Sequence, residues 1–487
     1  MAQADAKTTV SPAAGRAQKP SRLRQFWQVA QLPILAFVTA ILVGGVIIAL
    51  SDFKVLEELA KAFNSLNAVG VGVLLLAVVA LAGGVYVSRN SDRVLRRLTG
   101  QTFSGWPGRL VNLAFLAGGV VASILMLRAA GFGSALDAAW SAVVTAYGAL
   151  FEGSIGSPTQ MLAALQSGDA AAVREAFYPI TESLVATTPY IFAGLAVALG
   201  FRAGLFNIGA EGQLFVGATT SAFVGYAVTG LPAIIHIPLA LAAGALGGAV
   251  WGYIPAILKA RFGAHEVINT IMMNYIAFRL SEWLLNGPMK RGGPSGPVPV
   301  SPTILPSAEL PRFFEVPIRF HAGFFIALAV AAFVWWLLFR TTRGFELRTV
   351  GQNPNAARYA GMSITRNVVL TMCISGALAG LAGANEVLGV NHNLALAFSS
   401  GYGFDSIALA LLGKSHPFGV VLAALLFGTL RSGGTRMQNV AKIPVDIIGV
   451  TQALVIAFIA APAIIRALYR VRESRAMGEV FTRGWGR

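Results

Sequence analysis

Residues 322–340 have the sequence AGFFIALAVAAFVWWLLFR, in which no charged side chain precedes Arg340. A hydrocarbon core about 30 Å thick is crossed by roughly 20 apolar residues in a helix. Membrane strands would instead alternate apolar and polar positions. This stretch therefore predicts a membrane-spanning helix and, together with the others like it, an all-α fold.

The overall composition supports a membrane protein built mostly from such stretches. Of the 487 residues, 55% are hydrophobic and only 12% are charged, whereas roughly 25% is usual in soluble proteins. The chain has a single cysteine, Cys373. Disordered chains, disulfide scaffolds and most soluble enzymes are thereby excluded. We expect a polytopic transmembrane helical bundle.

About twelve stretches (10–12) are apolar enough to count as spans. They lie near 33–50, 68–88, 109–128, 183–201, 210–229, 234–258, 267–286, 322–340, 366–390, 402–413, 416–432 and 446–467. The 402–413 stretch is too short to cross alone, which predicts a broken or half-crossing helix. The first stretch resembles the core of a signal peptide, but no small-residue cleavage site follows Leu50, so a retained anchor is expected.

The net charge of +16 is concentrated in a few segments. Lys and Arg gather in 1–32, 89–109, 340–366 and the tail after residue 465, whereas 129–181 has one Arg and four acidic residues. Because cytoplasmic loops are enriched in Lys and Arg, we expect the four basic segments and both termini in the cytoplasm. The long 287–321 loop is an exception, with basic residues on the outer side. No folded, aromatic-bearing basic surface is apparent, so no nucleic-acid partner is expected.

The distribution of motifs predicts five parts along the chain. They are a disordered cytoplasmic tail (1–32), an accessory N-terminal membrane unit (33–130), an extracytoplasmic segment with short helices along the outer surface (131–180), a core domain that carries most of the motifs (181–468) and a basic cytoplasmic tail (469–487).

The sequence has no motif for ATP, metal or cofactor chemistry. Gly413-Lys414-Ser415 fits the end of a phosphate-binding loop, but Ala408 stands where the first glycine is required. His and Cys lack metal-ligand spacing. No catalytic, cofactor or metal residue is therefore assigned, and the chain is not expected to be an enzyme. Uphill transport would need an ion gradient or a partner that hydrolyses ATP.

A first polar cluster lies in residues 201–213, FRAGLFNIGAEGQ. Asn207 and Glu211 would share a helix face if the helix begins there, and Gln213 follows them. One interpretation is a hydrogen-bond network that fixes helix packing. The other is a gate or a lining of the solute path.

A second cluster lies in residues 265–275, HEVINTIMMNY. Buried amides in a membrane helix are costly unless they are paired or face water. Asn269 and Asn274 are five residues apart and do not stack on one line of the helix. They either join helices or face a hydrated path.

A third stretch, residues 343–361, is RGFELRTVGQNPNAARYAG. Asn353 can cap a short helix with Pro354 at its first position, and Gly361 can end it. This predicts a capped cytoplasmic helix between two spans. It either seals the protein or docks into a cytoplasmic partner.

A fourth region joins NEVLGVNHN at 385–393 to GYGFDSIA at 401–408. Its glycines permit an interrupted helix, which can place polar groups at mid-membrane. Asn385 and Glu386 are candidates for the path. Phe404 could stack on a planar solute, and Asp405 could bind one or could simply cap a helix.

These four stretches resemble the permease subunits of bacterial ABC uptake transporters, in the branch of the ribose and branched-chain amino acid permeases. GLFNIGAEGQ at 204–213 and EVINTIMMNY at 266–275 are most similar to the nucleoside group that is linked to basic membrane proteins. GQNPNAARYAG at 351–361 is similar to the helix by which such subunits couple to their ATPase. The resemblance covers about 180–468, and the second and third spans exceed the family pattern.

The resemblance implies import through a path between two permease subunits, identical or sister, in the lipid bilayer of the bacterial inner membrane. Cytoplasmic ABC ATPase subunits would dock on the short helix, and an extracytoplasmic solute-binding lipoprotein would deliver nucleoside. The coupling residues implied are Gly351, Asn353, Pro354, Ala356, Ala357, Arg358 and Gly361. The candidates for the path are Asn207, Glu211, Gln213, Asn269, Asn274, Asn385, Glu386, Phe404 and Asp405.

Two alternatives are kept open. A simple sugar such as ribose is the nearest alternative cargo, because no residue selects nucleoside over pentose. An ion-coupled secondary carrier is the alternative mechanism. The few acidic residues in the spans lie mostly near the predicted ends, which weakens the case for ion coupling. The lack of a clustered set of catalytic polar groups disfavours an enzyme, and the capped cytoplasmic helix disfavours a passive channel.

Overall fold

The computed structural model describes residues 22–99, 106–293 and 296–442, and scattered positions between 447 and 464. Within these residues every regular element is a helix, and β pairing is confined to two isolated bridges, Val300 with Ala395 and Arg312 with His321. The predicted all-α fold is confirmed.

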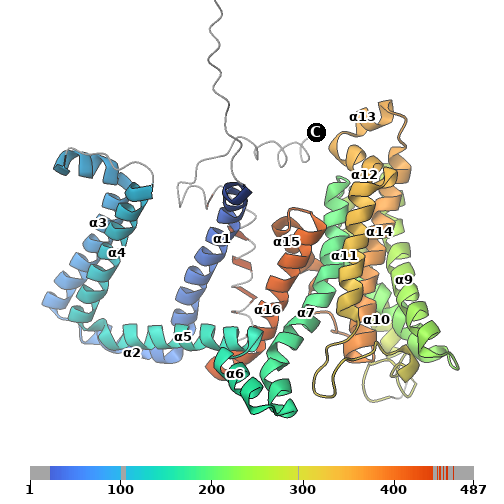
Figure 1. Cartoon of the computed structure of the whole chain (residues 1–487), viewed down its shortest axis with the longest axis horizontal. Helices are drawn as coiled ribbons and strands as arrows, with labels where there is room; N and C mark the ends of the chain where they lie inside the picture. The colour runs from blue at the N-terminus through green and yellow to red at the C-terminus, as the bar shows by residue number, and fades with distance from the viewer. Residues whose placement is uncertain are drawn as a thin grey trace, which may run out of the picture.

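Six helices and a π-helical turn precede the core. They are α1 (Arg22–Ser51), α2 (Phe53–Asn64), α3 (Ala68–Thr99), α4 (Trp106–Leu127), η1 (Arg128–Phe132), α5 (Gly133–Ile155) and α6 (Pro158–Ser167). Gly131 in η1 has φ +97°, which side chains rarely adopt, and the chain changes direction there. Figure 1 shows α5 and α2 lying across the lower end of the molecule, while the α3–α4 hairpin stands apart from the core.

Within the described residues, the core consists of ten α-helices, one 3-10 turn (η2) and one π-helical turn (η3). In chain order they are α7 (Ala170–Arg202), α8 (Ala210–Ala227), α9 (Ala233–Phe262), α10 (Glu266–Asn286), η2 (Pro306–Ala308), α11 (Gly323–Arg340), α12 (Thr342–Gln352), α13 (Pro354–Tyr359), α14 (Ile364–Asn385), η3 (Glu386–Asn391), α15 (Tyr402–Leu412) and α16 (Pro417–Ala441). α7 is the most enclosed, because every residue from 187 to 200 is buried.

Small residues let the core helices approach closely. A Cβ atom at Gly248 in α9 would lie 2.8 Å from the Cα of Gly380 in α14, and Gly217 in α8 also meets Gly380. Close crossings of this kind are typical of membrane helices, in which packing and not water drives association. α8, α9 and α14 therefore form one tight group beside α7.

Eight helical stretches among the described residues are long and apolar enough to cross a membrane. The predicted total of about twelve is not confirmed by this count and stays a prediction. α15 has 11 residues, which agrees with the half-crossing helix expected at 402–413.

One predicted boundary needs correction, and others lie outside the described residues. α1 begins at Arg22, so residues 22–32 belong to a helix and not to the tail predicted for 1–32. Residues 1–21 and the predicted tail at 469–487 lie outside the described residues, and the 446–467 span is described only at scattered positions.

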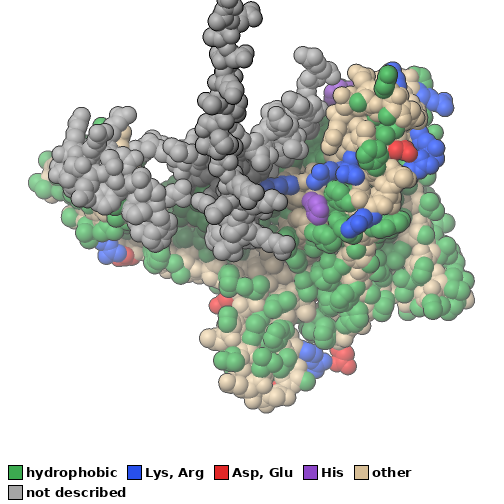
Figure 2. Space-filling view, turned by 45° about the horizontal axis from the view of Figure 1, so that its top comes forward, with side chains coloured by type: hydrophobic (Ala, Val, Ile, Leu, Met, Phe, Trp, Pro, Cys, Tyr) green, Lys and Arg blue, Asp and Glu red, His purple; other side chains and the backbone are tan. Residues whose placement is uncertain are grey.

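The described parts of the basic segments share one end of the molecule. The start of α1, the junction of α3 and α4, and α12–α13 all lie at the upper end in Figure 1, opposite α5 and α6. Figure 2, with this end turned forward, shows Lys and Arg side chains gathered over the α12–α13 part. The described parts of three basic segments therefore lie at one end, whereas the tail after residue 465 lies outside the described residues, and the cytoplasmic orientation stays a prediction.

Candidate functional site

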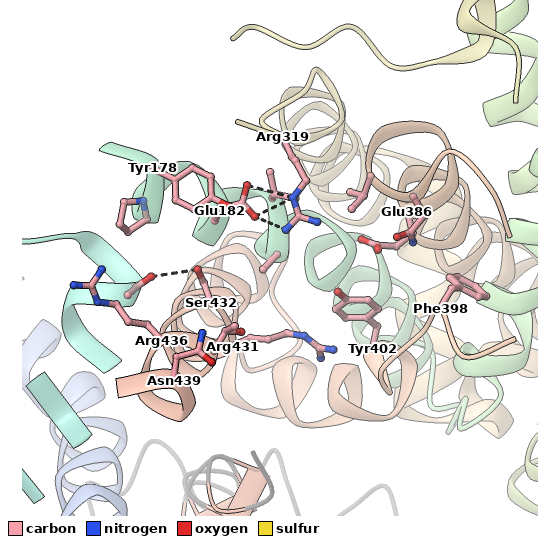
Figure 3. Close-up of a pocket in the computed structure, with 17 residues that line it drawn as sticks. Tyr178, Glu182, Arg319, Glu386, Phe398, Tyr402, Arg431, Ser432, Arg436 and Asn439 are labelled. Atoms are coloured by element: carbon pink, nitrogen blue, oxygen red, sulfur yellow. Dashed lines mark hydrogen bonds and ion pairs between the residues drawn. The ribbon is translucent and has the colours of Figure 1, made fainter. Parts of the chain in front are cut away.

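A cavity of about 500 Å³ lies in the half of the core away from α13, where the first half of α7 and the second half of α16 line it. Its wall combines α7, the loop before α11, η3, the start of α15 and the second half of α16 (Figure 3). Ser432 of α16 donates a hydrogen bond to the carbonyl of Gly153 in α5 at 3.3 Å. Arg436 donates to Glu152 at 2.9 Å, so α5 closes one side of the cavity.

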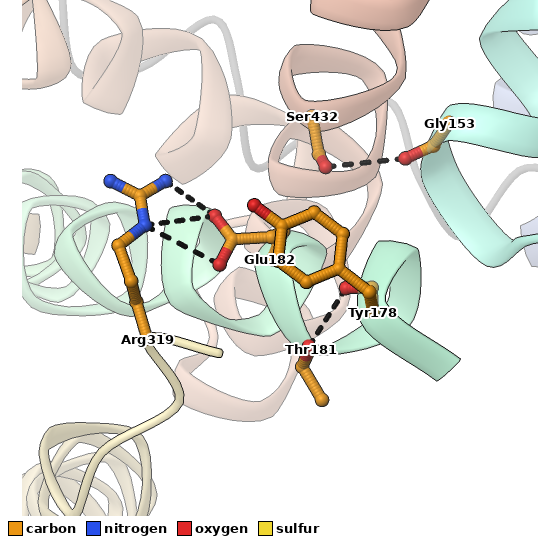
Figure 4. Close-up of polar contacts among 6 residues, drawn as sticks. All are labelled: Gly153, Tyr178, Thr181, Glu182, Arg319 and Ser432. Carbon is orange, nitrogen blue, oxygen red and sulfur yellow. Dashed lines mark hydrogen bonds and ion pairs between the residues drawn. The ribbon is translucent and has the colours of Figure 1, made fainter. Parts of the chain in front are cut away.

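An ion pair stands at one side of this cavity. Arg319, in the loop before α11, donates to Glu182 of α7, with Nε 3.1 Å from Oε2 and Nη2 in contact with the same oxygen. Figure 4 shows the ring of Tyr178 beside the pair. The 287–321 loop is basic although it lies outside the segments predicted to be cytoplasmic. The ion pair gives a physical reason, because the carboxylate of Glu182 in the core binds Arg319 of this loop.

The other basic residues of this loop also have defined partners. Arg291 donates to the carbonyl of Ser301 at 3.2 Å and to Thr303 at 2.8 Å. Arg312 contacts His392. The loop is thus fastened to itself and to the segment after η3.

A second cation, Arg431 of α16, forms the opposite wall. It donates to the hydroxyl of Tyr190 at 3.0 Å, and its guanidinium lies 4.5 Å from the centre of the Tyr402 ring. Tyr190 in turn donates to Asp405 at 2.9 Å. The chain of contacts joins α16, α7 and α15, and a cation over an aromatic face is attracted by the ring.

Glu386 begins η3 and lines the cavity between these two cations. The residue is only 5% exposed, and no hydrogen bond to its side chain occurs among the described residues. Figure 3 shows it beside Tyr402, with Phe398 nearby. The wider turn of a π-helix is a frequent feature of functional sites.

At the opposite end of the core, α13 has the geometry that the sequence predicts. The Asn353 side chain accepts hydrogen bonds from the backbone N–H groups of Asn355 and Ala356, both at 3.1 Å, and Pro354 is the first helical residue. Gly361 has φ +80° and ends the turn. The predicted capped helix is confirmed.

The surface of α13 differs from what the sequence indicated. Ala357 is fully buried, so it packs against the core and does not point outward. Tyr359 is 97% exposed at the tip, a position that the sequence analysis did not select. Gly351 is needed for close approach, since a Cβ there would lie 2.7 Å from the backbone nitrogen of Gly204.

Comparison with known proteins assigns the chain to a family. Residues 180–465 match the family described as the permease component of the branched-chain amino acid transport system. The chain belongs to this permease family. The match begins within α7, so α1–α6 lie outside it.

Several curated proteins are similar to this permease. The guanosine ABC transporter permease NupP of Bacillus subtilis is 46% identical over 292 residues, which cover 59% of the chain and 83% of the relative. The nucleoside ABC transporter permease NupB of Lactococcus lactis is 35% identical over 295 residues, covering 59% and 81%. A glucose ABC transporter permease of Haloferax volcanii is 38% identical over 293 residues, covering 58% and 76%. No solved structure gave a significant match.

Several of the predicted path residues of the permease form hydrogen bonds within the core and do not line the cavity. Asn207 donates to Gln213 and to Ser375, both at 2.8 Å. α8 begins only at Ala210, so Asn207 lies before the helix. The condition under which Asn207 and Glu211 would share a helix face is therefore not met. The packing interpretation of Asn207 and Gln213 is the one that the contacts favour.

Glu211 and Asn274 also hold helices together. Glu211 accepts hydrogen bonds from Ser399 at 2.6 Å and from the N–H of Gly403 at 2.5 Å, which fixes the start of α15. Asn274 accepts from the N–H of Gly212 at 2.8 Å and donates to the carbonyl of Ile208 at 3.0 Å. Such polar contacts stabilise membrane helix pairs.

The remaining candidates have less defined surroundings. The side-chain amide nitrogen of Asn269 and both polar side-chain atoms of Asn385 are buried and have no hydrogen-bond partner among the described residues. Phe404 is 45% exposed and is not among the residues that line the cavity. Asp405 is not a helix cap, because Gly401 occupies that position and Asp405 binds Tyr190.

The cavity residues other than Glu386 were not predicted from the sequence. Glu182, Arg319, Tyr402 and Arg431 come together only through folding. One signal was available, because Arg431 is a cation within the predicted 416–432 span, and charged residues inside spans usually have functional roles.

Proposed function

We propose that this permease forms the membrane path for nucleoside uptake in an ABC importer. Membership of the permease family supports transport, and the guanosine and nucleoside permeases among its relatives support the cargo. In this proposal both termini and α13 are cytoplasmic, and two permease subunits form the path. An extracytoplasmic solute-binding lipoprotein delivers the cargo.

The observation that carries the ATP-driven mechanism is the α13 tip. A capped helix that projects from the core with a fully exposed aromatic side chain suits a protein interface, where tyrosine is enriched among the residues that dominate binding. The permease itself would contribute no ATP site, and a separate ATPase pair would supply the energy.

The deciding experiment is ATP-driven uptake by proteoliposomes that contain this chain, its ATPase and its solute-binding lipoprotein. Labelled guanosine, ribose and glucose are compared with ATP inside and outside, with and without a proton or sodium gradient. We expect guanosine accumulation that requires ATP and no gradient. Accumulation of a sugar alone would select the simple-sugar alternative, which the glucose permease relative makes reasonable. Accumulation by the chain without its ATPase would contradict the mechanism.

The docking role of α13 predicts a specific loss of coupling. Tyr359→Ala should reduce ATP-driven uptake about tenfold or more, because an interface tyrosine often contributes 2 kcal/mol or more to binding. Co-purification of the ATPase should fall with it, while the unfolding temperature of the permease stays the same. The matched control is Tyr86→Ala in α3, where the side chain is also exposed. Equal coupling in both variants would show that the tip does not dock.

A further inference from the structure

One carboxyl group of the cavity, that of Glu386, accepts no hydrogen bond from the residues that the structure describes. Glu182 is paired with Arg319, and Asp405, outside the cavity lining, accepts from Tyr190. Glu386 is buried, lines the cavity and accepts no hydrogen bond within the described residues. Buried polar groups are normally paired. Because Glu386 lines the cavity, a solute that donates hydrogen bonds can reach its carboxyl group.

The cations of the cavity are already engaged. Arg319 binds Glu182, Arg436 binds Glu152, and Arg431 binds Tyr190 and covers the ring of Tyr402. An anionic solute would meet Glu386 and would have to break one of these contacts. The electrostatics therefore favour a neutral solute over a phosphorylated one.

Aromatic surface is available beside the carboxyl group. Phe398 and Tyr178 are half-buried and line the cavity. The Phe398 ring is held against Phe215, with 4.8 Å between ring centres, so its position is fixed before a solute arrives. A volume of about 500 Å³ lies within the usual range of small-molecule sites, roughly 300–1,000 Å³.

We propose that this cavity is a binding station for a neutral nucleoside, with Glu386 accepting hydrogen bonds from two adjacent donors of the solute and Phe398 stacking on its base. The inference rests on the proposed function and gives it a location. Two parts of guanosine present adjacent donors, the 2′,3′-diol of the ribose and the N1–H and N2–H of the base. Each part presents two adjacent hydrogen-bond donors to a carboxylate, and competition by analogues distinguishes them.

The test is photolabelling of the permease–ATPase complex in nanodiscs, without a solute-binding protein, by 8-azidoguanosine. We expect mass spectrometry to place the label on peptides that contain Tyr178 or Phe398, with protection by guanosine and little by guanosine monophosphate. Glu386→Gln should reduce labelling about tenfold, the usual scale for a lost hydrogen bond to a charged group. The control Glu315→Gln changes a carboxylate of the outer loop that is 85% exposed and should label like the unmodified chain.

Competition by analogues identifies which donors Glu386 binds. If it holds the diol, 2′,3′-dideoxyguanosine should compete about tenfold less well than guanosine, and Glu386→Gln should abolish that difference. If Glu386 holds the base, inosine, which lacks the N2–H donor, should compete about tenfold less well than guanosine, and Glu386→Gln should abolish that difference. A purely structural role for Glu386 would change the amount of folded protein but not these ratios. Phe398→Leu, which keeps the apolar contact with Phe215, provides a second variant should Glu386→Gln fail to fold, and it should also weaken protection by guanosine.

The outcomes separate this inference from the proposed function. Guanosine transport with labelling outside the cavity, or with unchanged labelling in Glu386→Gln, would overturn the station and leave nucleoside uptake standing. Equal protection by guanosine monophosphate would overturn the preference for a neutral solute. ATP-driven ribose uptake without guanosine uptake would instead refute the nucleoside cargo itself.

Discussion

The core and the N-terminal unit are built from similarly apolar helices, yet they pack very differently. In the most apolar part of α7, 83% of residues are buried inside the protein, whereas the corresponding share in α3 is 11%. The α3–α4 hairpin stands apart from α7–α16 (Figure 1). Apolar composition therefore indicates that a helix belongs in the membrane, but it does not indicate whether protein or lipid surrounds that helix.

The difference lies in small residues and polar contacts. Gly217, Gly248 and Gly380 let three core helices meet backbone to backbone. In the hairpin the comparable close crossing is between Gly84 and Gly119, where a Cβ at Gly84 would lie 2.7 Å from the Cα of Gly119. We infer that the core requires a small residue at many helix crossings, whereas the hairpin requires one at few.

The largest expected effect is at a core crossing. Gly248→Leu should prevent folding, because its side chain would strike the backbone of α14, which cannot move aside. The measurement is the yield of monodisperse protein after detergent extraction. Gly83→Ala in α3, where no atom lies within 4 Å of the new Cβ, is the control and should give normal yield. Normal yield from both would remove the contrast between the two regions.

A pH effect is expected at the end of the core away from α13. Burial lowers the pKa of His321 to about 4, and the nearby charges of Arg312 and His392 act in the same direction. Its Nδ1 accepts a hydrogen bond from the N–H of Gly323, as a neutral ring can. The folded state thus binds fewer protons than the unfolded state between about pH 4 and 6.5, so stability is complete above that window and declines as the pH falls through it.

We expect the free energy of unfolding to fall by about 2–3 kcal/mol between pH 7 and pH 4 from this residue. Denaturant unfolding of detergent-solubilised protein measures it. His321→Asn should flatten the dependence, whereas His265→Gln, at an exposed position before α10, should leave it unchanged. A dependence that persists in His321→Asn would assign it to other groups.

A smaller difference in stability is expected between polar contacts of the core and those of the α3–α4 hairpin. Asn274→Ala leaves the N–H of Gly212 and the carbonyl of Ile208 unpaired and should cost about 1–2 kcal/mol of stability. Ser123→Ala in α4 removes one hydrogen bond, to the carbonyl of Ala77, and should cost only about 0.5 kcal/mol. Unfolding temperatures measured side by side give the comparison. A larger loss for Ser123→Ala would reverse it.

The smallest effect on transport is expected in the hairpin. Gly84→Leu should push α3 and α4 apart, yet ATP-driven uptake should stay within about twofold of normal, as is usual for changes away from a site. Gly119→Leu should behave alike, since it faces the same crossing. A severe loss of uptake with normal yield would make the hairpin part of the transport mechanism.

Local features could be predicted from the sequence because their causes are local. The cap of α13 follows from Asn353, Pro354 and Gly361, which lie within one short segment. The short α15 follows from the length of its apolar stretch. The roles of Asn207 and Asn274 could not be predicted, since their partners lie on other helices. Family membership followed from long runs of sequence, and the profile match confirms it.

The sequence by itself determined that this chain is an all-α membrane protein with a capped helix between α12 and α14, because hydropathy, helix length and capping depend on neighbouring residues. Only the tertiary structure decided which polar side chains bind each other and which face the cavity. Glu182, Arg319, Glu386 and Arg431 come from four separate elements. Whether a buried charge is paired or left for a solute depends on distances that only packing fixes.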